Sequence, residues 1–439
     1  MSAPGYDNYR ESGIEWLGQV PSHWTIEKFR HRFRESSEKI ETDVVGPMLS
    51  VSGYRGIEIK EYDDENRRRR DDELVGYRIV RPGQLVVNTM WLNYAGLGVS
   101  AHEGHVSPAY RSYWIRPGLE GRYAHHLMRS SIYVQGYTRL LTGIRPNSLQ
   151  MSRDDLMEFP VVVPPLAEQA AIAAFLDRET GKIDALVEAQ TRLIELLKEK
   201  RQAVISHAVT KGLDPAAPMK NSGIEWLDQV PAHWEVKPIK AVASYNDDIL
   251  TEATPPDHEI AYVEISDVQA GVGIAGSTAY AFSDAPSRAR RRVQCGDIIV
   301  STVRTYLRAI AAVTAPADNM IVSTGFAVIR PRAINSRFIG YALLAEHTIN
   351  EIIARSVGIS YPAINASDLV RIPVSVPPLA EQVAIATFLD RATAKIDALL
   401  NAAEEAIALL QERRAALIAA AVTGKIDVRR LAPQQAEAA

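Results

Sequence analysis

Cysteine is almost absent from this sequence, since Cys295 is the only one in 439 residues. A single cysteine excludes an internal disulfide framework and any metal site built from several cysteines. The chain also lacks the ~18 consecutive apolar residues that a membrane helix needs, and Met1–Arg10 contains no apolar core of a signal peptide. We therefore expect a cytoplasmic protein with no membrane segment and no metal site.

The chain also lacks a large excess of positive or negative side chains. Lysine and arginine number 49 against 53 aspartates and glutamates, which gives a formal net charge of −4. Non-specific binding to nucleic-acid phosphates depends on a positive surface, so such a surface would require local segregation of charge. The apolar share of 46% and the charged share of 23% are ordinary for a globular protein, and the length suffices for about two to four domains.

Signatures of catalysis are missing as well. The sequence contains no Walker A motif and no Asp/Asn-Pro-Pro-aromatic tetrad of the kind that amino-methyltransferases use. Residues 271–276 fit the G-x-G-x-x-G pattern, but a dinucleotide site needs a helix directly after this pattern, and residues 277–282 do not resemble a helix start. We interpret the pattern as a glycine-rich turn, and we expect a protein that is not an enzyme and binds no cofactor itself.

What the sequence does contain is an internal duplication, which is the first feature to seek in a long chain. Ser-Gly-Ile-Glu-Trp-Leu at residues 12–17 recurs at residues 222–227, and Pro-x-His-Trp follows a few residues later in both copies. Near the end of each copy, Val-Pro-Pro-Leu-Ala-Glu-Gln begins at Val163 and again at Val376. A period of ~210 residues is far longer than the ~20–50 of a solenoid. The sequence therefore predicts a domain duplication with a pseudo-two-fold relation between the copies.

The middles of the two copies are far less alike, although they share an outline. Residues 81–87 parallel residues 294–300, and both end in a β-branched run typical of a strand. Short strand-like runs alternate with turn residues and a few helical patches. We predict a mixed α/β fold in which the copies have the same frame and different contents.

A long stretch of helical periodicity follows each Pro-Pro pair. Apolar residues recur at steps of three and four among Glu, Lys, Arg, Gln and Ala. Pro165 and Pro378 suit the first helical turn, and Gly212 and Gly424 suit the C-terminal caps. The residues predicted to pair the helices are Ile183, Leu186, Leu193, Leu197 and Val204 in copy one, and Ile396, Leu399, Ile407, Leu410 and Leu417 in copy two.

A single long helix cannot bury a narrow apolar stripe on its own. The simplest partner is its duplicate, so we predict two long helices that form an antiparallel coiled coil and join the two copies. The alternative is that each helix packs onto its own globular domain. Helical periodicity over residues 183–209 covers ~40 Å at ~1.5 Å per residue, close to the ~34–36 Å between half-sites one DNA turn apart.

Two segments in each copy have the residue types that contact DNA. Residues 88–94 and 301–308 follow matching strands, and residues 142–147 parallel residues 358–362. Arg, Asn, Thr and Tyr reach base edges and phosphates, and copy two has an additional arginine-rich stretch. The candidate DNA-binding residues are Asn88, Thr89, Trp91, Asn93, Tyr94 and Arg145 in copy one, and Arg288, Arg290, Arg291, Arg292, Ser301, Arg304, Tyr306, Arg308, Ser360 and Tyr361 in copy two.

With these features in place, the chain resembles the specificity subunit of type I restriction–modification systems over essentially its full length. The resemblance rests on the twin Ser-Gly-Ile-Glu-Trp-Leu…Pro-x-His-Trp openings and on the twin Pro-Pro-Leu-Ala-Glu-Gln helix starts, each followed by Phe-Leu-Asp at residues 175–177 and 388–390. The resemblance implies two target recognition domains, each of which reads one half of a bipartite site on double-stranded DNA. It also implies helices that set the spacer and dock two methyltransferase subunits, which bring S-adenosylmethionine.

The resemblance further implies a division of the chain. We expect target recognition domain 1 at residues 1–163, a conserved helix at 164–212, target recognition domain 2 at 213–376, a second conserved helix at 377–426 and a tail at 427–439. Whether motor–nuclease subunits also join for cleavage is left open. A coiled-coil scaffold that joins two protein-binding domains is the alternative function; it explains the helices and the net acidity, but not the segregation of arginines. The missing tetrad argues against a stand-alone methyltransferase.

Overall fold

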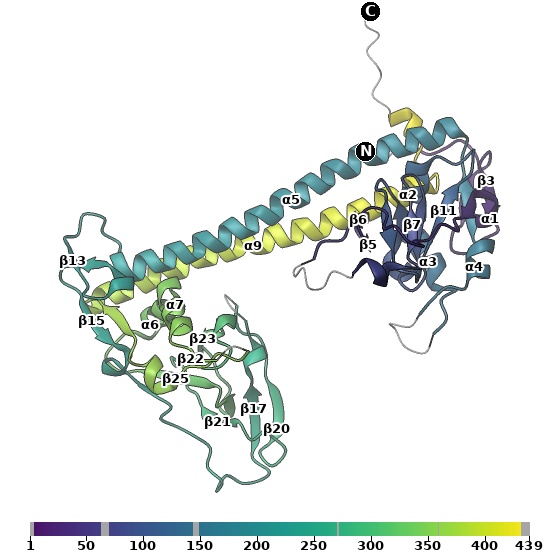
Figure 1. Ribbon diagram of the computed structural model, residues 1–439. Coiled ribbons are helices and arrows are strands. Elements are labelled where there is room, and N and C mark those ends of the chain that lie inside the picture. Colours follow the sequence, from purple (N-terminus) through teal and green to yellow (C-terminus); the bar gives the residue numbers. More distant parts are fainter. Residues whose placement is uncertain (1–3, 63–69, 144–148, 270–271, 359, 432–439) are drawn as a thin grey trace, which may run out of the picture. The chain divides into compact units, whose positions relative to one another are not determined.

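The structure, a computed structural model, describes residues 4–62, 70–143, 149–269, 272–358 and 360–431. It contains two compact units, each of which combines a globular part with parts of two long helices. Unit 1 comprises Met1–Thr191 and Glu405–Ala439, and unit 2 comprises Arg192–Glu404. Figure 1 shows the course of the chain and the labels of its elements.

Unit 1 is built around a four-stranded antiparallel sheet. Its strand order is β4(Phe33–Glu35), β11(Tyr110–Ile115), β8(Leu85–Asn88) and β9(Leu97–Val99). The run Leu-Val-Val-Asn makes β8 a fully buried strand, as expected for apolar and β-branched residues. The smaller strand pairs are β1(Tyr9–Glu11) with β2(Gln19–Pro21), β3(Thr25–Lys28) with β12(Pro160–Val163), β5(Leu49–Ser52) with β6(Gly56–Ile59), and β7(Arg78–Val80) with β10(Gly104–Val106).

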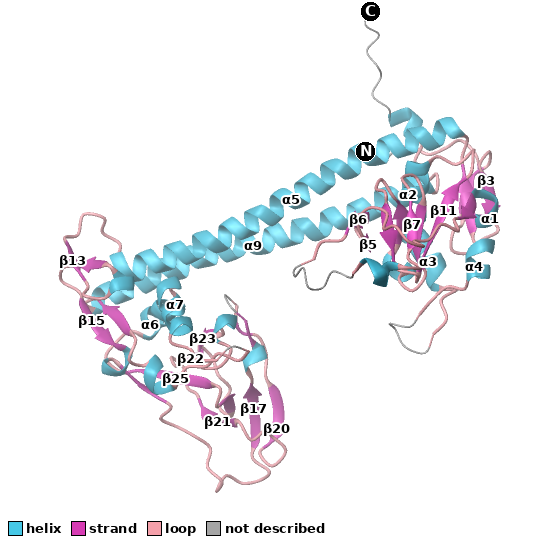
Figure 2. Ribbon diagram, in the orientation of Figure 1, coloured by secondary structure: helices cyan, strands magenta, loops and turns pink. Residues whose placement is uncertain are grey.

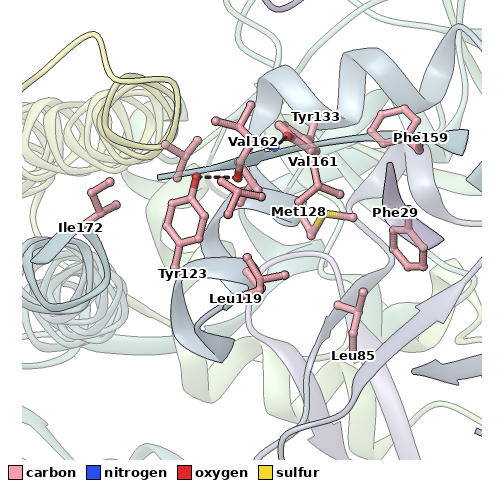
Figure 3. Packing of buried hydrophobic residues seen from close by; sticks show 14 of the residues in the cluster. Phe29, Leu85, Leu119, Tyr123, Met128, Tyr133, Phe159, Val161, Val162 and Ile172 are labelled. Carbon is pink, nitrogen blue, oxygen red and sulfur yellow. Dashed lines mark hydrogen bonds between the residues drawn. The ribbon is translucent and has the colours of Figure 1, made fainter. Parts of the chain in front are cut away.

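Short helices pack against these strands and close the core of unit 1. They are α1(Phe29–Arg32), α2(Gly121–Arg129), α3(Ser131–Thr138) and α4(Arg153–Glu158). In the core shown in Figure 3, the hydroxyl of Tyr123 donates to the carbonyl of Val162 at 3.1 Å, and the hydroxyl of Tyr133 accepts from the N–H of Val162 at 2.9 Å. Both buried tyrosines are thereby satisfied. Ile172 belongs to the same cluster, so the first long helix is anchored on this core.

Unit 2 repeats the central sheet of unit 1 and adds a second one. The repeated sheet has the order β16(Ala243–Tyr245), β25(Phe326–Pro331), β22(Ile298–Ser301) and β23(Ile310–Ala312). The added sheet has the order β20(Thr278–Ala281), β17(Glu259–Val263), β24(Met320–Ser323) and β21(Ala289–Arg292), in which β17 and β24 are parallel. The mixed α/β fold class is confirmed, and Figure 2 shows its helices and strands.

The remaining elements of unit 2 are small. The strand pairs are β13(Met219–Asn221) with β14(Gln229–Pro231), β15(Glu235–Pro238) with β26(Pro373–Val376), and β18(Val268–Gln269) with β19(Gly273–Ile274), and the helices are α6(Ser336–Leu344), α7(Glu346–Ala354) and α8(Ala366–Leu369). The described part of the glycine-rich pattern lies at the β18–β19 hairpin, and the next element is the strand β20. This arrangement is a turn between strands, as interpreted from the sequence, because a dinucleotide loop leads into a helix.

The long helices α5(Leu166–Lys211) and α9(Leu379–Val422) run antiparallel. In unit 1 the first part of α5 meets the last part of α9, where Arg414 donates to Asp184 at 2.9 Å. In unit 2 the last part of α5 meets the first part of α9, where Arg201 donates to Asp397 at 3.1 Å. Within each unit the two helices therefore lie side by side (Figure 1), which confirms the predicted antiparallel pairing.

The buried stripe of each helix advances in alternating steps of three and four residues. Ile183, Leu197 and Ile396 are buried, and Val204, Ile407, Leu410 and Leu417 are half-buried. Three predicted pairing residues lie outside the stripe instead, because Leu186, Leu193 and Leu399 are exposed. Each of them follows a stripe position by three residues, which at ~3.6 residues per turn places it on the neighbouring face.

Candidate nucleic-acid interface

Loop 1, defined as residues 88–95, follows the central strand β8 of unit 1. Asn88 is buried, and its side-chain oxygen accepts a hydrogen bond from the N–H of Met90 at 3.2 Å, which turns the chain at the end of the strand. Leu92 is fully buried and anchors the short helix η3(Leu92–Tyr94). Trp91 and Tyr94 stay 55% and 59% exposed, with ring centroids 5.9 Å apart. Loop 1 thus presents two aromatic rings on a fixed base.

Loop 2, defined as residues 301–308, stands at the matching place after strand β22 of unit 2. Ser301 is buried, and its hydroxyl donates to the carbonyl of Val303 at 2.6 Å. Thr305 is buried at the start of η8(Thr305–Leu307), whereas Tyr306 is 51% exposed. Arg304 and Arg308 have φ values of 50° and 55°. Left-handed backbone is uncommon for residues other than glycine, and surrounding contacts must hold it in place.

A second segment supports loop 2 and adds to its exposed surface. The N–H of Arg304 donates to the carbonyl of Pro362 at 2.8 Å, and the N–H of Ile364 donates to the carbonyl of Thr302 at 2.9 Å. The guanidinium of Arg304 lies 4.8 Å from the ring centroid of Tyr361, which is 66% exposed. The two candidate segments of unit 2 therefore lie together. Their shared surface has the guanidinium of Arg304 and the rings of Tyr306 and Tyr361.

The corresponding segment of unit 1 contacts loop 1 in the same way. The N–H of Met151 donates to the carbonyl of Thr89 at 3.1 Å. Asn93 has a buried side-chain oxygen without a hydrogen-bond partner among the described residues. Arg145 lies outside the described residues. Ser360, a candidate in the parallel segment of unit 2, is exposed.

The arginine-rich stretch of unit 2 forms strand β21. Arg290 stacks 4.6 Å from the ring centroid of Phe282, and Arg291 is half-buried, which lowers its pKa. Arg288 and Arg292 are exposed, and Arg292 lies 3.8 Å from Asp248. The carbonyl of Arg288 accepts a hydrogen bond from the N–H of Thr324 at 2.8 Å. Because the adjacent Gly325 accepts from the N–H of Thr302 at 2.8 Å, the start of β21 lies next to loop 2.

Arg308 has a partner of its own within unit 2. Its two terminal nitrogens donate to the two carboxylate oxygens of Glu346, each at 2.7 Å. Such a bidentate pair fixes the geometry of a guanidinium. Arg308 therefore holds the end of loop 2 in place, and Arg304 is the cation that the loop leaves at its surface.

The twin Pro-x-His-Trp motifs have a role that residue types alone did not suggest. In unit 1, Trp24 Nε1 donates to Glu168 Oε2 at 2.9 Å, and His23 Nε2 lies 2.8 Å from Glu168 Oε1. Tyr6 and Arg429 also contact this carboxylate, at 3.1 Å and 3.3 Å. Burial raises the pKa of Glu168, but the hydrogen bonds from Trp24, His23 and Tyr6 outweigh it and hold the pKa below 4.5.

The same contact between a His-Trp pair and a glutamate, here called the joint, recurs in unit 2, where the glutamate has fewer partners. Trp234 Nε1 donates to Glu381 Oε2 at 2.9 Å, and His233 Nε2 lies 2.6 Å from Glu381 Oε1. Each joint fastens the start of a long helix to the start of a globular part. The recurrence of His-Trp and of Pro-Pro-Leu-Ala-Glu-Gln was the sequence signal for this contact, although the signal did not say that the two motifs meet.

Metal sites and membrane spans are both absent from the described residues. No group of three His, Cys, Asp or Glu side chains among them is placed to hold a metal ion. None of the helices in this part of the chain has both the length and the apolar character that crossing a bilayer requires.

Comparison with known proteins gives consistent matches. The profile of the type I restriction modification DNA specificity domain matches residues 231–408. The chain is 22% identical to the type I restriction enzyme EcoDI specificity subunit of Escherichia coli, over 75% of this chain and 75% of that protein. It is 23% identical to the type I restriction enzyme MjaVIII specificity subunit of Methanocaldococcus jannaschii, over 62% of this chain and 63% of that protein.

Solved structures with a similar fold come from the same kind of system. A chain from a structural study of the complex assembly and conformational transition of the type I R-M system aligns with a TM-score of 0.69 at 17% identity, over 93% of this chain and 99% of that one. The HsdS subunit from Thermoanaerobacter tengcongensis aligns with a TM-score of 0.50 at 17% identity, over 95% and 100% of the two chains. At such identities the likeness concerns the fold.

Proposed function

Because the chain belongs to the family of type I restriction–modification specificity subunits, we propose that each of its two units reads one half of a bipartite target on double-stranded DNA. Specificity subunits are not catalytic, so methyl transfer requires separate methyltransferase subunits with S-adenosylmethionine. We assign target recognition to residues 1–163 and 213–376, and spacing and subunit docking to the helices at 164–212 and 377–426. Such a complex works on DNA in the cytoplasm.

One observation carries this proposal: loops 1 and 2 stand at the same place of a repeated frame and present different side chains. Trp91 and Tyr94 of loop 1 correspond in the repeat to Arg304 and Leu307 of loop 2. Exposed Arg and aromatic side chains contact base edges and phosphates. Two half-sites of different sequence require the same backbone arrangement in both units and different exposed side chains on the loops. A scaffold for two proteins does not explain the exposed arginine on loop 2.

The proposal is tested by finding which DNA sites become methylated. The chain is produced with its methyltransferase subunit in cells that lack other DNA methylation, and the methylated bases are mapped by sequencing. We expect one motif with two specified halves and a gap of fixed length. A matched culture with the methyltransferase subunit alone is the control. A continuous motif, or methylation that does not depend on this chain, would contradict the proposal.

Docking of two methyltransferase subunits is supported by four exposed leucines on the long helices. Leu186 and Leu409 in unit 1 are 51% and 65% exposed, and Leu196 and Leu399 in unit 2 are 45% and 54% exposed. Leu186 and Leu399 occupy the same position of the repeat, as do Leu196 and Leu409. Each unit thus offers the same apolar pair once, as two copies of one partner require.

Replacing one of these pairs tests the docking surface. We expect the Leu186→Gln/Leu409→Gln variant to bind one methyltransferase subunit instead of two, because the pair in unit 2 is intact. Native mass spectrometry of the assembled complex gives the count. Glu412→Gln, at an exposed position of the same helix, should leave the count unchanged. Two bound subunits in the leucine variant would contradict this assignment.

A further inference from the structure

The end of loop 1 is held in place by one half-buried arginine, Arg129. Arg129, the last residue of α2, donates from Nη1 to the carbonyl of Ala95 at 3.1 Å and to that of Leu97 at 2.5 Å. The same guanidinium donates to the carbonyls of Ser52 and Gly53, at 3.2 Å and 2.8 Å. Burial, together with repulsion from Arg414, lowers the pKa of Arg129 to about 10. Its four contacts join loop 1 to the turn between β5 and β6.

That turn is itself attached to both long helices within unit 1. Tyr54 donates its hydroxyl hydrogen to Asp184 of α5 at 2.6 Å, and Arg414 of α9 lies 4.7 Å from the centroid of the Tyr54 ring. A Cβ at Gly53 would lie 2.6 Å from the carbonyl oxygen of Tyr94, so the turn packs directly on loop 1. Loop 1, Arg129, Tyr54 and the Asp184–Arg414 pair thus form one continuous series of contacts.

Unit 2 has a corresponding series made of different residues. Arg308, at the repeat position of Ala95, makes the bidentate pair with Glu346, the first residue of α7. The N–H of Glu346 donates to the hydroxyl of Ser206 on α5 at 3.1 Å, and Gln202 of α5 donates to the carbonyl of Leu344 at 2.6 Å. The end of loop 2 is therefore fastened to α5 through one arginine, one glutamate and one serine.

We propose that these two series are tethers that fix each reading loop on the long helices and thereby make the complex selective for one spacer length. This inference rests on the proposed function. Tyr54 and Arg129 in unit 1, and Arg308 and Glu346 in unit 2, are positioning residues, since each acts through contacts to the end of a loop or to the turn beside it. A loop whose end is free to shift can follow a half-site displaced by one base pair, whereas a tethered loop cannot.

The tether of unit 1 is tested with Tyr54→Phe, which removes the hydroxyl and keeps the ring. The full complex with its methyltransferase subunits is assayed on three duplexes that carry the target with its own spacer or with one base pair more or fewer. We expect discrimination against the altered spacers to fall ~10-fold, the lower end of the effect of losing one hydrogen bond to a charged group, with the rate on the correct duplex nearly unchanged. Tyr245→Phe, at an exposed tyrosine of unit 2, should keep full discrimination.

The tether of unit 2 is tested with Glu346→Gln and with the reversed pair Arg308→Glu/Glu346→Arg. We expect Glu346→Gln to relax spacer discrimination and the reversed pair to restore part of it, while the melting temperature stays near that of the parent. A merely structural role would lower stability and total activity without changing the ratio between spacers. If Tyr54→Phe and Glu346→Gln both discriminate between spacer lengths as well as the parent does, the proposed tethers are overturned. A parental complex without any spacer preference overturns the proposed function itself.

Discussion

Arg304 is the residue at which the proposed reading of DNA by unit 2 is most directly tested. Its guanidinium is exposed beside the Tyr361 ring, whereas Arg308 is held by Glu346. We expect Arg304→Ala to weaken binding of the target duplex by the assembled complex ~10-fold at ~0.1 M salt, the loss of one good base or phosphate contact. Fluorescence anisotropy measures the affinity.

The control for this substitution is Arg371→Ala, because Arg371 is exposed in the same unit and pairs with Asp368 near α8. Its affinity for the target should match that of the parent. A shallower dependence of the affinity on salt in Arg304→Ala marks a phosphate contact, and an altered base preference marks a base contact. Equal affinities of Arg304→Ala and the parent would remove Arg304 from the interface.

Glu168 and Glu381 occupy the same position of the repeat but differ in burial. The side chain of Glu168 is 8% exposed and that of Glu381 is 41% exposed. We expect Glu168→Gln to destabilise unit 1 by ~2 kcal/mol and Glu381→Gln to destabilise unit 2 by less than ~1 kcal/mol, because hydrogen bonds to a buried charge contribute most. Hydrogen exchange at neutral pH, followed peptide by peptide, separates the two units.

The pH dependence of this joint follows from the lowered pKa of Glu168. A carboxyl whose pKa is lower in the folded than in the unfolded state adds stability above its unfolded pKa, and that stability is lost as the pH falls through the folded pKa. The difference in the stability of unit 1 between the parent and Glu168→Gln should therefore shrink below pH ~4.5. A difference that persists at low pH would assign the joint to packing alone.

Residue types selected the candidate loops but did not predict the orientation of each side chain in them. Asn88 and Ser301 have the chemistry of base contacts, yet both are buried and bond to their own loops. Their burial depends on how the end of a central strand packs against the rest of the unit, and this packing cannot be predicted from one sequence. Arg129 was not selected at all, since it has no counterpart in the other copy and works through backbone carbonyls.

At the scale of elements, α5 and α9 differ by a glycine that has no packing role. Gly181 lies within α5, nothing would contact a Cβ added there within 4 Å, and the repeat position in α9 is Ala394. Glycine inside a helix is ~0.5–1 kcal/mol less favourable than alanine. We expect Gly181→Ala to stabilise the chain by about that amount, as measured by urea unfolding with an unchanged denaturant slope.

The matched substitution for this prediction is Gly136→Ala in α3. A Cβ at Gly136 would lie 2.8 Å from the Trp16 ring, so the helical gain should be outweighed by the clash and the variant should be less stable than the parent. Stabilisation by Gly136→Ala, or destabilisation by Gly181→Ala, would contradict the packing of these two helices.

Helix periodicity predicted the long helices and their pairing, because a long helix buries a narrow apolar stripe most simply against a second helix of the same kind. The order of unit, helix, unit and helix along the chain predicted the antiparallel direction. The periodicity did not separate the pairing face from the neighbouring one, where Leu186, Leu193 and Leu399 lie, since both faces carry apolar residues at steps of three and four. The added sheet of unit 2 was not predicted either. Its strands pair across more than fifty residues, from β17 to β24, and local sequence does not specify such pairing.

At the scale of the whole molecule, the two terminal segments meet inside unit 1. The N–H of Asp427 donates to the carbonyl of Pro4 at 2.7 Å, and the hydroxyl of Tyr9 donates to the carbonyl of Gly424 at 2.8 Å. In unit 2 the equivalent connection between helix and globular part is continuous chain, at residues 212–222. We expect a circular permutant, with residues 431 and 4 joined by a flexible linker of ~10 residues and new ends between residues 213 and 218, to fold and to bind DNA with its partner subunits.

The control permutant opens the chain between Val86 and Val87, inside the buried strand β8, and should not fold. Far-UV circular dichroism and hydrogen exchange report on both variants. Loss of protection in unit 1 of the first permutant would show that the terminal contacts do not substitute for a peptide link.

Unit 1 contains the first 191 residues and also residues 405–439, whereas unit 2 is one continuous stretch. Ile418, Ala421 and Val422 of α9 belong to the same buried cluster as Phe29 and Tyr123. On the ribosome, where domains fold as they emerge, the half of the protein that is made first must therefore wait for the last turns of α9, with part of its core uncovered. The order in which the two halves are completed is the reverse of the order in which they are translated.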